Sequence, residues 1–240
     1  MACGLKPLAP EMPAAPATRL RVLACSPRAG GNSDTAARLI GAAGRAAGLA
    51  VEELFLREFT VQPCVSCGYC LKHPGRCPLD AGDDAGRLFA ALHDAERLVI
   101  VAPVYFYGPP AGLKALVDRA QRFWATSPAA GPARDPLGDA AGNRAGDWAD
   151  CPATRPAAIA LCAGRTNGER LFEPSLLILR CFLRALGREP SPPLLIRGVD
   201  DRDALAGDPA LIRQVTEWSR DIVRPGAPAQ SHAPMDSPCR

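Results

Sequence analysis

Lysine is scarce in this chain of 240 residues, and no basic run occurs in it. The only lysines are Lys6, Lys72 and Lys114, so arginine supplies nearly all of the 28 basic residues, against 25 acidic ones. A formal net charge of +3 without a basic run does not form the electrostatic footprint of a nucleic-acid-binding protein. We therefore expect no nucleic-acid partner.

Long apolar runs are also absent. No stretch reaches the roughly 18 apolar residues that mark a membrane-spanning helix, and the first residues lack the apolar core of a secretory signal peptide. We therefore expect no membrane partner and a cytoplasmic location, where thiols stay reduced. The 10 cysteines are then free thiols or metal ligands rather than a disulfide framework.

The hydrophobic content of 48% is enough for one sizeable α/β domain. Apolar segments typical of strands alternate with amphipathic segments typical of helices. Strands are expected at 19–25, 51–56, 97–102, 156–162 and 194–198, and helices at 33–47, 82–93, 110–124, 171–186 and 209–223. This alternation predicts a five-stranded parallel sheet covered by helices on both faces, which is a three-layer α/β fold.

Two terminal segments and two internal loops interrupt this pattern. Residues 1–17 and 224–240 have no periodic apolar face, so we expect a flexible N-terminal arm and a disordered C-terminal tail around one domain, 18–223. Inside the domain, 57–81 and 126–155 are longer than the usual connections, and such loops are usually functional or disordered. The first is a cysteine-rich insertion after the second strand, and the second carries no chemistry that we can identify.

Four cysteines, Cys64, Cys67, Cys70 and Cys77, have the spacing C-x2-C-x2-C-x6-C. Thiolates two residues apart can each hold a different iron of a compact cluster, and Cys77 can hold the fourth. A structural zinc site more often splits into two pairs separated by about a dozen residues. The spacing therefore favours a 4Fe-4S cluster, with zinc and metal-free thiols as alternatives.

A glycine-containing loop with the sequence SPRAGGNSDT occupies residues 26–35, between the first strand and the first helix. Its glycines let backbone N–H groups converge at a helix N-terminus, and Ser26, Ser33 and Thr35 offer hydroxyl groups. The loop lacks the glycine spacing of a dinucleotide site and the Gly-Lys-Ser/Thr ending of a P-loop. It therefore predicts a site for a terminal phosphate, the alternative being a plain helix cap by Asn32 or Ser33.

An aromatic stretch, PVYFYG at residues 103–108, follows the third strand. In a flavodoxin-like sheet the first and third strands flank the point where the strand order reverses, and ligands bind there at the carboxyl ends of the strands. The flat side chains of Tyr105, Phe106 and Tyr107 suit the wall of a site for an isoalloxazine ring. The alternative is that they fill the core.

Together these motifs resemble the iron-sulfur flavoprotein branch of the NADPH-dependent FMN reductase family. The resemblance is carried by the 26–35 loop, the cysteine motif, and PVYFYG followed by GLKALVDR at 112–119, in the same order over residues 19–223. It implies a flavodoxin-like fold with strand order 2-1-3-4-5, FMN at the 26–35 loop, and a 4Fe-4S cluster near the flavin. The chain departs from the family at 163–166 (AGRT), where the family has a more glycine-rich loop.

Residue by residue, the resemblance implies three groups of cofactor contacts. The FMN phosphate would be held by Ser26, Arg28, Asn32, Ser33 and Thr35; the ring would be lined by Pro103, Val104, Tyr105, Phe106, Tyr107 and Gly108; the cluster would be bound by Cys64, Cys67, Cys70 and Cys77. The resemblance also implies NAD(P)H as electron donor, a homo-oligomer (dimer or tetramer) and a ferredoxin-type redox partner.

The expected function is that of an FMN-dependent oxidoreductase in which FMN exchanges electrons in pairs or singly and the cluster exchanges them singly. The protein then positions and tunes its cofactors, and no side chain acts as acid, base or nucleophile. Two alternatives remain: an NAD(P)H-dependent FMN or quinone reductase without a cluster, and a non-enzymatic flavodoxin-like electron carrier.

Overall fold

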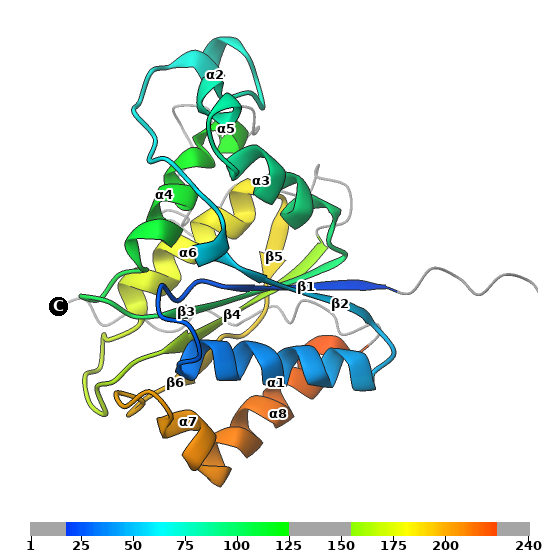
Figure 1. The fold of residues 1–240 in the computed structure, drawn as a ribbon, viewed down its shortest axis with the longest axis vertical. Helices are drawn as coiled ribbons and strands as arrows, with labels where there is room; N and C mark the ends of the chain where they lie inside the picture. Colours follow the sequence, from blue (N-terminus) through cyan, green and yellow to red (C-terminus); the bar gives the residue numbers. More distant parts are fainter. Residues whose placement is uncertain (1–17, 125–154, 225–240) are drawn as a thin grey trace, which may run out of the picture.

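A parallel β-sheet forms the centre of the computed structural model, which describes residues 18–124 and 155–224 (Figure 1). The strands β1 (Arg19–Ala24), β2 (Ala50–Phe55), β3 (Arg97–Pro103) and β4 (Arg155–Cys162) lie in the order β2-β1-β3-β4. Two short strands, β5 (Arg188–Pro190) and β6 (Leu194–Ile196), both pair with β4. The predicted order 2-1-3-4-5 and the parallel pairing are confirmed.

The fifth position of the sheet differs from the expectation in one respect. We predicted one strand at 194–198, whereas two strands share this position, with Pro192 and Pro193 between them. Proline has no N–H to donate to a sheet, so pairing along β4 is interrupted there. The sheet therefore has six strands in five positions.

Five helices of nine residues or more lie in the described part of the chain: α1 (Asn32–Ala46), α3 (Ala85–Asp94), α4 (Ala111–Arg119), α6 (Glu173–Ala185) and α8 (Pro209–Val223). The short helices α2 (Tyr69–Lys72), α5 (Gln121–Trp124) and α7 (Ala204–Gly207), with 3-10 turns at Leu56–Glu58 and Pro78–Ala81, were not predicted as separate elements. The expected helix 82–93 begins three residues late, at Ala85, because residues 82–84 bond to residues 60–62. The expected helix 110–124 divides into two helices at Ala120.

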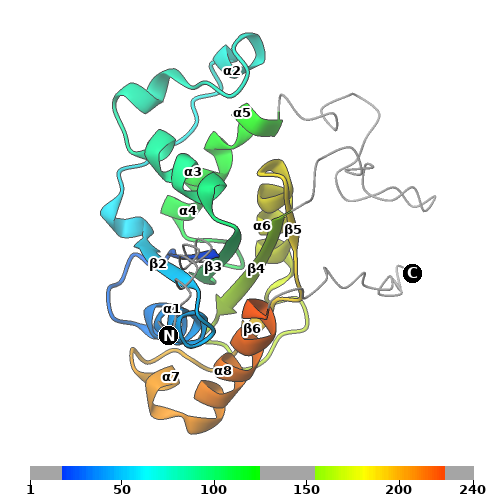
Figure 2. The ribbon, with the colours of Figure 1, turned by 90° about the vertical axis from the view of Figure 1, so that its right-hand side faces the viewer.

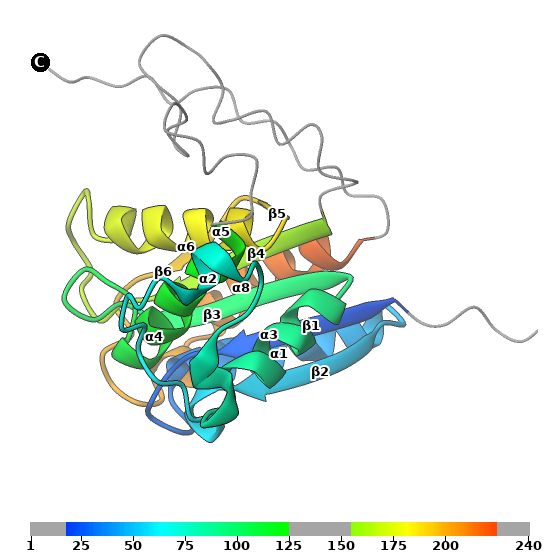
Figure 3. The same ribbon diagram turned by 90° about the horizontal axis from the view of Figure 1, so that it is seen from above.

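The two faces of the sheet are covered by different helices, as the turned view shows (Figure 2). Leu98 and Ile100 belong to the core under α3, α4 and α6, whereas Val99 and Val101 belong to the core under α1 and α8. This alternation follows from the two-residue period of a strand. Seen from above, α3, α4 and α6 lie across one face of the sheet (Figure 3), so the three-layer expectation is confirmed.

The loops of interest leave the carboxyl ends of β1, β2, β3 and β4, which share one edge of the sheet. We call residues 57–81 the cysteine segment; it runs outward beyond α3 and α4, and its helix α2 lies next to α5 (Figure 1). The expected N-terminal arm, nearly all of the expected C-terminal tail and nearly all of the 126–155 loop lie outside the described residues. In the ranges that are described, no helix is both long and apolar enough to span a bilayer.

Candidate functional site

The loop between β1 and α1 presents backbone N–H groups at the start of a helix. The first helical bond runs from Thr35 N to Gly31 O at 3.0 Å, so the N–H groups of Asn32, Ser33 and Asp34 have no partner within the helix. The N-cap residue is Gly31, and no side chain caps the helix. The alternative of a plain cap by Asn32 or Ser33 is therefore wrong, and the N–H groups remain available to an anion.

Two predicted phosphate ligands use their side chains to build the loop. Ser26 Oγ accepts from Arg28 N at 3.2 Å and donates to Arg28 O at 3.0 Å. Asn32 Nδ2 donates to Val199 O at 2.9 Å and Asp201 O at 2.7 Å, and its Oδ1 accepts from Leu205 N at 2.9 Å. The amide of Asn32 thus joins the loop to the chain that follows β6, and both of its N–H donors are occupied.

A buried ion pair braces the same loop. Asp34 is fully buried, and its Oδ2 accepts from Gly30 N at 2.7 Å. Its Oδ1 lies 3.0 Å from Arg57 Nη1, and Arg57 also reaches Ser26 O at 3.4 Å. Arg57 lies two residues after the end of β2, so the first residue of the cysteine segment is bonded to this loop.

A second arginine closes the loop from the opposite side. Arg202 Nη2 donates to Ala29 O at 2.7 Å, and a Cβ at Gly30 would lie 3.0 Å from the same nitrogen. Gly30 has a φ of +68°, which glycine adopts without strain. With Arg28 exposed on the loop, three arginines surround it, and this charge suits an anionic ligand.

The aromatic stretch after β3 forms a tight hairpin at the surface. Tyr105 and Gly108 exchange two backbone hydrogen bonds of 2.9 Å, and the residues between them, Phe106 and Tyr107, have φ values of +50° and +66°. Positive φ at both central residues is the signature of a type I′ turn, and it is uncommon for bulky side chains. Tyr105, Phe106 and Tyr107 are 47%, 102% and 44% exposed, so core packing is wrong for all three.

Two polar contacts hold this hairpin against its neighbours. Ser175 Oγ, from α6, donates to Tyr107 O at 3.0 Å, and Arg165 Nη1, from the loop after β4, donates to Tyr107 Oη at 3.2 Å. At the base of the hairpin, Val104 N donates to Cys162 O at 2.8 Å. The loops after β1, β3 and β4 are therefore neighbours, because those strands are adjacent in the sheet.

Two buried thiols lie beneath these loops. Burial raises the pKa of Cys25, and it raises that of Cys162 to about 12 although a hydrogen bond from Ser33 acts in the opposite direction. Both thiols are inert at neutral pH. The hydroxyl group of Ser33 is thus directed to Cys162, and the phosphate assignment of Ser33 depends on its backbone N–H.

The four cysteines of the cysteine segment are free thiols. Cys67 is exposed, and Cys64, Cys70 and Cys77 are partly buried. Among residues 18–124 and 155–224, no three Cys, His, Asp or Glu side chains come together in a way that could hold a metal ion. The donor set has the chemistry of an iron-sulfur site, but the described conformation does not gather the sulfur atoms.

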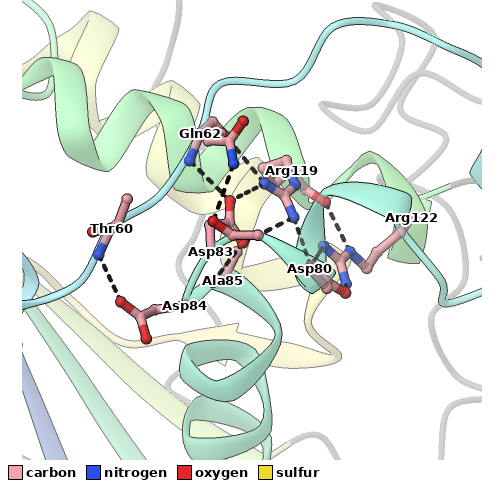
Figure 4. Close-up of polar contacts among 9 residues, drawn as sticks. Thr60, Gln62, Asp80, Asp83, Asp84, Ala85, Arg119 and Arg122 are labelled. Carbon is pink, nitrogen blue, oxygen red and sulfur yellow. Dashed lines mark hydrogen bonds and ion pairs between the residues drawn. The ribbon is translucent and has the colours of Figure 1, made fainter.

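The cysteine segment leaves and re-enters the domain through a closed neck, which we define as residues 60–62 and 82–84 (Figure 4). Asp84 N donates to Thr60 O at 2.8 Å, and Thr60 N donates to Asp84 Oδ2 at 2.9 Å. Gln62 N donates to Asp83 Oδ2 at 2.9 Å. The residues between the two sides of the neck therefore form a loop that is closed at its base and joined to Arg119 and Arg122 through Asp80.

Sequence reasoning missed Asp34, Arg57, Arg202, Arg165 and Ser175. Two of them could have been found from the sequence: Asp34 lies inside the 26–35 motif, and Arg57 follows a predicted strand at the edge of the sheet where ligands bind. Arg202 lies more than 170 residues from its partner Ala29, and no local pattern indicates that contact.

Comparison with known proteins gives two results. The family model described as NADPH-dependent FMN reductase matches residues 18–185, which is more than half of the chain. Two curated relatives are iron-sulfur flavoproteins: one of Methanocaldococcus jannaschii, 33% identical over 96 residues, and one of Methanosarcina thermophila, 36% identical over 98 residues. Each match covers 40% of this chain and 48% of the relative, so the chain spans about half the length of the curated relatives it matches.

Among solved structures, the chain is similar to an NAD(P)H:quinone oxidoreductase from Methanothermobacter marburgensis, with a TM-score of 0.60. The alignment covers 85% of this chain and 96% of that protein at 17% sequence identity. At this identity the likeness supports the fold alone.

Proposed function

The chain belongs to the NADPH-dependent FMN reductase family, and from this premise we propose that it is an FMN-dependent oxidoreductase with a 4Fe-4S cluster as its second redox centre. The observation that carries the flavin part is the set of unpaired N–H groups at the start of α1, surrounded by three arginines. Bound FMN supplies hydride and single-electron transfer chemistry, and the protein binds and orients it.

The phosphate of FMN binds at the backbone N–H groups of Asn32, Ser33 and Asp34. Arg28 and the hydroxyl group of Thr35 supply the side-chain contacts. The side chains of Ser26 and Asn32 shape the loop, since their polar atoms already have partners within the protein. The Asp34–Arg57 pair neutralises the only acidic residue in the loop, which would otherwise repel the phosphate.

The flavin ring lies against the hairpin after β3. Pro103, Val104 and Gly108 form its base, and Tyr105, Phe106 and Tyr107 supply flat side chains. Exposed aromatic side chains held in a strained turn favour a ligand-binding role over a packing role.

The cluster is proposed at Cys64, Cys67, Cys70 and Cys77. Support comes from four free thiols in one segment, from their spacing, and from relatives that are named iron-sulfur flavoproteins. The separation of the sulfur atoms favours a second candidate function, an NAD(P)H-dependent FMN or quinone reductase without a cluster.

We further propose NAD(P)H as electron donor, a ferredoxin-type partner and a homo-oligomer, dimer or tetramer. Support for association comes from large apolar side chains on the surface: Val65 is 66% exposed, Leu71 73% and Phe106 fully exposed. Exposed apolar side chains of this size favour protein contacts.

The test is an assay of FMN, iron and acid-labile sulfide on protein purified without oxygen. We expect FMN, iron and sulfide in the parent, and FMN alone in Cys67→Ser, because one thiolate ligand is lost while the flavin loops are unchanged. Cys239→Ser, outside the motif, is the matched control and should keep both cofactors. A parent with FMN but no iron or sulfide after anaerobic reconstitution would establish the reductase without a cluster, and one zinc per chain would make the segment a structural site.

A further inference from the structure

A buried serine of α6 bonds to the hairpin after β3, residues 105–108, which we call the aromatic hairpin. Ser175 is the third residue of α6 and is fully buried. Its Oγ donates to Tyr107 O at 3.0 Å, a contact that joins residues 68 positions apart. Leu176 and Leu179 of the same helix lie in the core under α3, α4 and α6. The hydroxyl group is therefore presented to the hairpin from a rigid element.

The sequence of the aromatic hairpin does not itself favour the turn that the hairpin adopts. A type I turn has negative φ at both central residues and favours glycine at its fourth position, where Gly108 stands. A type I′ turn needs positive φ at both central residues, where asparagine, aspartate and glycine are preferred. Those positions carry Phe106 and Tyr107, with φ values of +50° and +66°. The local sequence therefore favours the mirror image of the observed turn.

Strand twist, which selects type I′ turns in longer hairpins, has little to act on here. The pairing consists of a single bridge between Tyr105 and Gly108, and no strand flanks it. The left-handed conformation lowers the population of a residue with a Cβ atom about 5- to 30-fold. Contacts outside the hairpin must therefore hold it in this turn.

The contacts that can do so converge on Tyr107. Phe106 is fully exposed, so its side chain buries no surface that could offset the strain. Tyr107 is held at two points, its carbonyl oxygen by Ser175 and its hydroxyl group by Arg165 Nη1 at 3.2 Å. Of these two donors, Ser175 bonds to the backbone of the turn and is shielded from water.

We propose that Ser175 is a positioning residue for the flavin site: its bond to the Tyr107 carbonyl group selects the left-handed turn and so fixes the direction in which the Tyr107 ring projects. Turns of types I and I′ are mirror images, so a hairpin without this bond would change hand and move the ring away from Arg165. This inference rests on the proposed function, which assigns the Tyr107 ring to the wall of the FMN site. A buried group on a helix preorganises that wall before the ligand arrives.

The experiment compares Ser175→Ala with Ser219→Ala in the full chain. Ser219 is the matched control, because it is also fully buried and its Oγ donates to a carbonyl oxygen, that of Val215, at 2.6 Å within α8. We measure FMN affinity by fluorescence quenching, the visible circular dichroism of bound FMN, and urea unfolding of FMN-free protein. Both variants lose one buried hydrogen bond and should unfold at lower urea concentration. Only Ser175→Ala should bind FMN several-fold more weakly and change the dichroism of the bound flavin.

A second substitution tests the turn itself. Asparagine tolerates positive φ, so Phe106→Asn should ease the left-handed turn and raise the urea midpoint of FMN-free protein. No packing is lost, because Phe106 is fully exposed. If Ser175 selects the turn, Ser175→Ala should weaken FMN binding less in the Phe106→Asn background than in the parent. A serine that only supports α6 would give the same effect in both backgrounds.

Ser175→Cys keeps the size of the side chain but has a weaker donor, and it replaces Ser175→Ala if that variant does not accumulate. It should also weaken FMN binding. Three results would overturn this inference and leave the proposed function intact: parent FMN affinity in the Ser175 variant, the same loss of affinity in Ser219→Ala, or an equal effect in both backgrounds. A parent that binds no FMN would overturn the proposed function as well.

Discussion

The ion pair between Asp34 and Arg57 gives the most direct test of how the phosphate loop is built. Asp34 is fully buried and Arg57 is 19% exposed, so the pair is shielded from solvent. Arg57→Met removes the cation and leaves the carboxylate buried beside the N–H groups proposed to bind phosphate. Breaking a buried pair in this way costs about 3–5 kcal/mol.

We expect the lower end of that range, about 3 kcal/mol, because Asp34 keeps its bond from Gly30 N. For a domain of this size, 1 kcal/mol corresponds to about 2–4 °C in melting temperature, so the variant should melt about 6–12 °C below the parent. The assay is urea and thermal unfolding of FMN-free protein at pH 7, followed by circular dichroism. FMN affinity, measured by quenching of flavin fluorescence, should fall as well because the unpaired carboxylate repels the phosphate.

The double variant Asp34→Asn with Arg57→Met removes both charges and should recover most of the lost stability. Arg45→Met is the matched control, since the Arg45–Glu53 pair joins α1 to β2 but Arg45 is 54% exposed, and its loss should cost less than about 1 kcal/mol. If Arg57→Met unfolds like the Arg45→Met control, or if the double variant is no more stable than Arg57→Met, then the buried pair does not stabilise the loop.

Three other outcomes are expected. Thr35→Ala should weaken FMN binding by about 1–3 kcal/mol, the upper end holding for a hydrogen bond to a charged phosphate. Ser33→Ala is the matched control, because the Ser33 hydroxyl group is directed to Cys162, and it should bind FMN like the parent. A fluorescence titration that gives the parent affinity for Thr35→Ala would contradict its hydroxyl contact. In metal-free protein at pH 8, iodoacetamide should label the cysteine segment and spare Cys162, because a pKa of about 12 leaves about one thiol in 10,000 ionised. Peptide mass spectrometry measures the labelling of each cysteine. Early labelling of Cys162 would count against its burial. Removal of the first 15 or the last 15 residues should leave soluble, flavin-loaded protein, since neither sequence offers a periodic apolar face; loss of flavin on trimming would show that the removed segment docks.

The order of the sheet was predictable because periodic apolar segments and parallel connections leave few topologies. The limits of prediction appear at single residues. Pro192 and Pro193 divide the last strand, and the short strand before them has too few residues to show a period. The late start of α3 depends on bonds from residues 82–84 to residues 60–62, which no local pattern contains.

The positions of the two candidate loops were predictable because they depend on local backbone, whereas the long-range side-chain pairing around them was not. The loop before α1 and the hairpin after β3 were found because glycines, a helix start and clustered aromatics lie close together in sequence. The side chain of Asn32 was predicted to bind phosphate. In the structure it donates to the carbonyl groups of Val199 and Asp201, which lie 167 and 169 residues further along the chain. Arg119 appeared only as the last residue of a family motif, and its partners Asp80 and Asp83 carried no signal of their own.

The closed neck of the cysteine segment makes that segment a transferable unit. Since Thr60 and Asp84 are directly bonded, a short turn could replace residues 63–81 without separating β2 from α3. Such a deletion would leave Arg122 without its carboxylate partner, because Asp80 is removed with the segment. Arg122 must therefore be replaced at the same time. Changes at residues 63–81 and at Arg122 would therefore give the same domain with and without the cysteine segment. Grafting the segment onto another flavodoxin-like protein would require the same two changes.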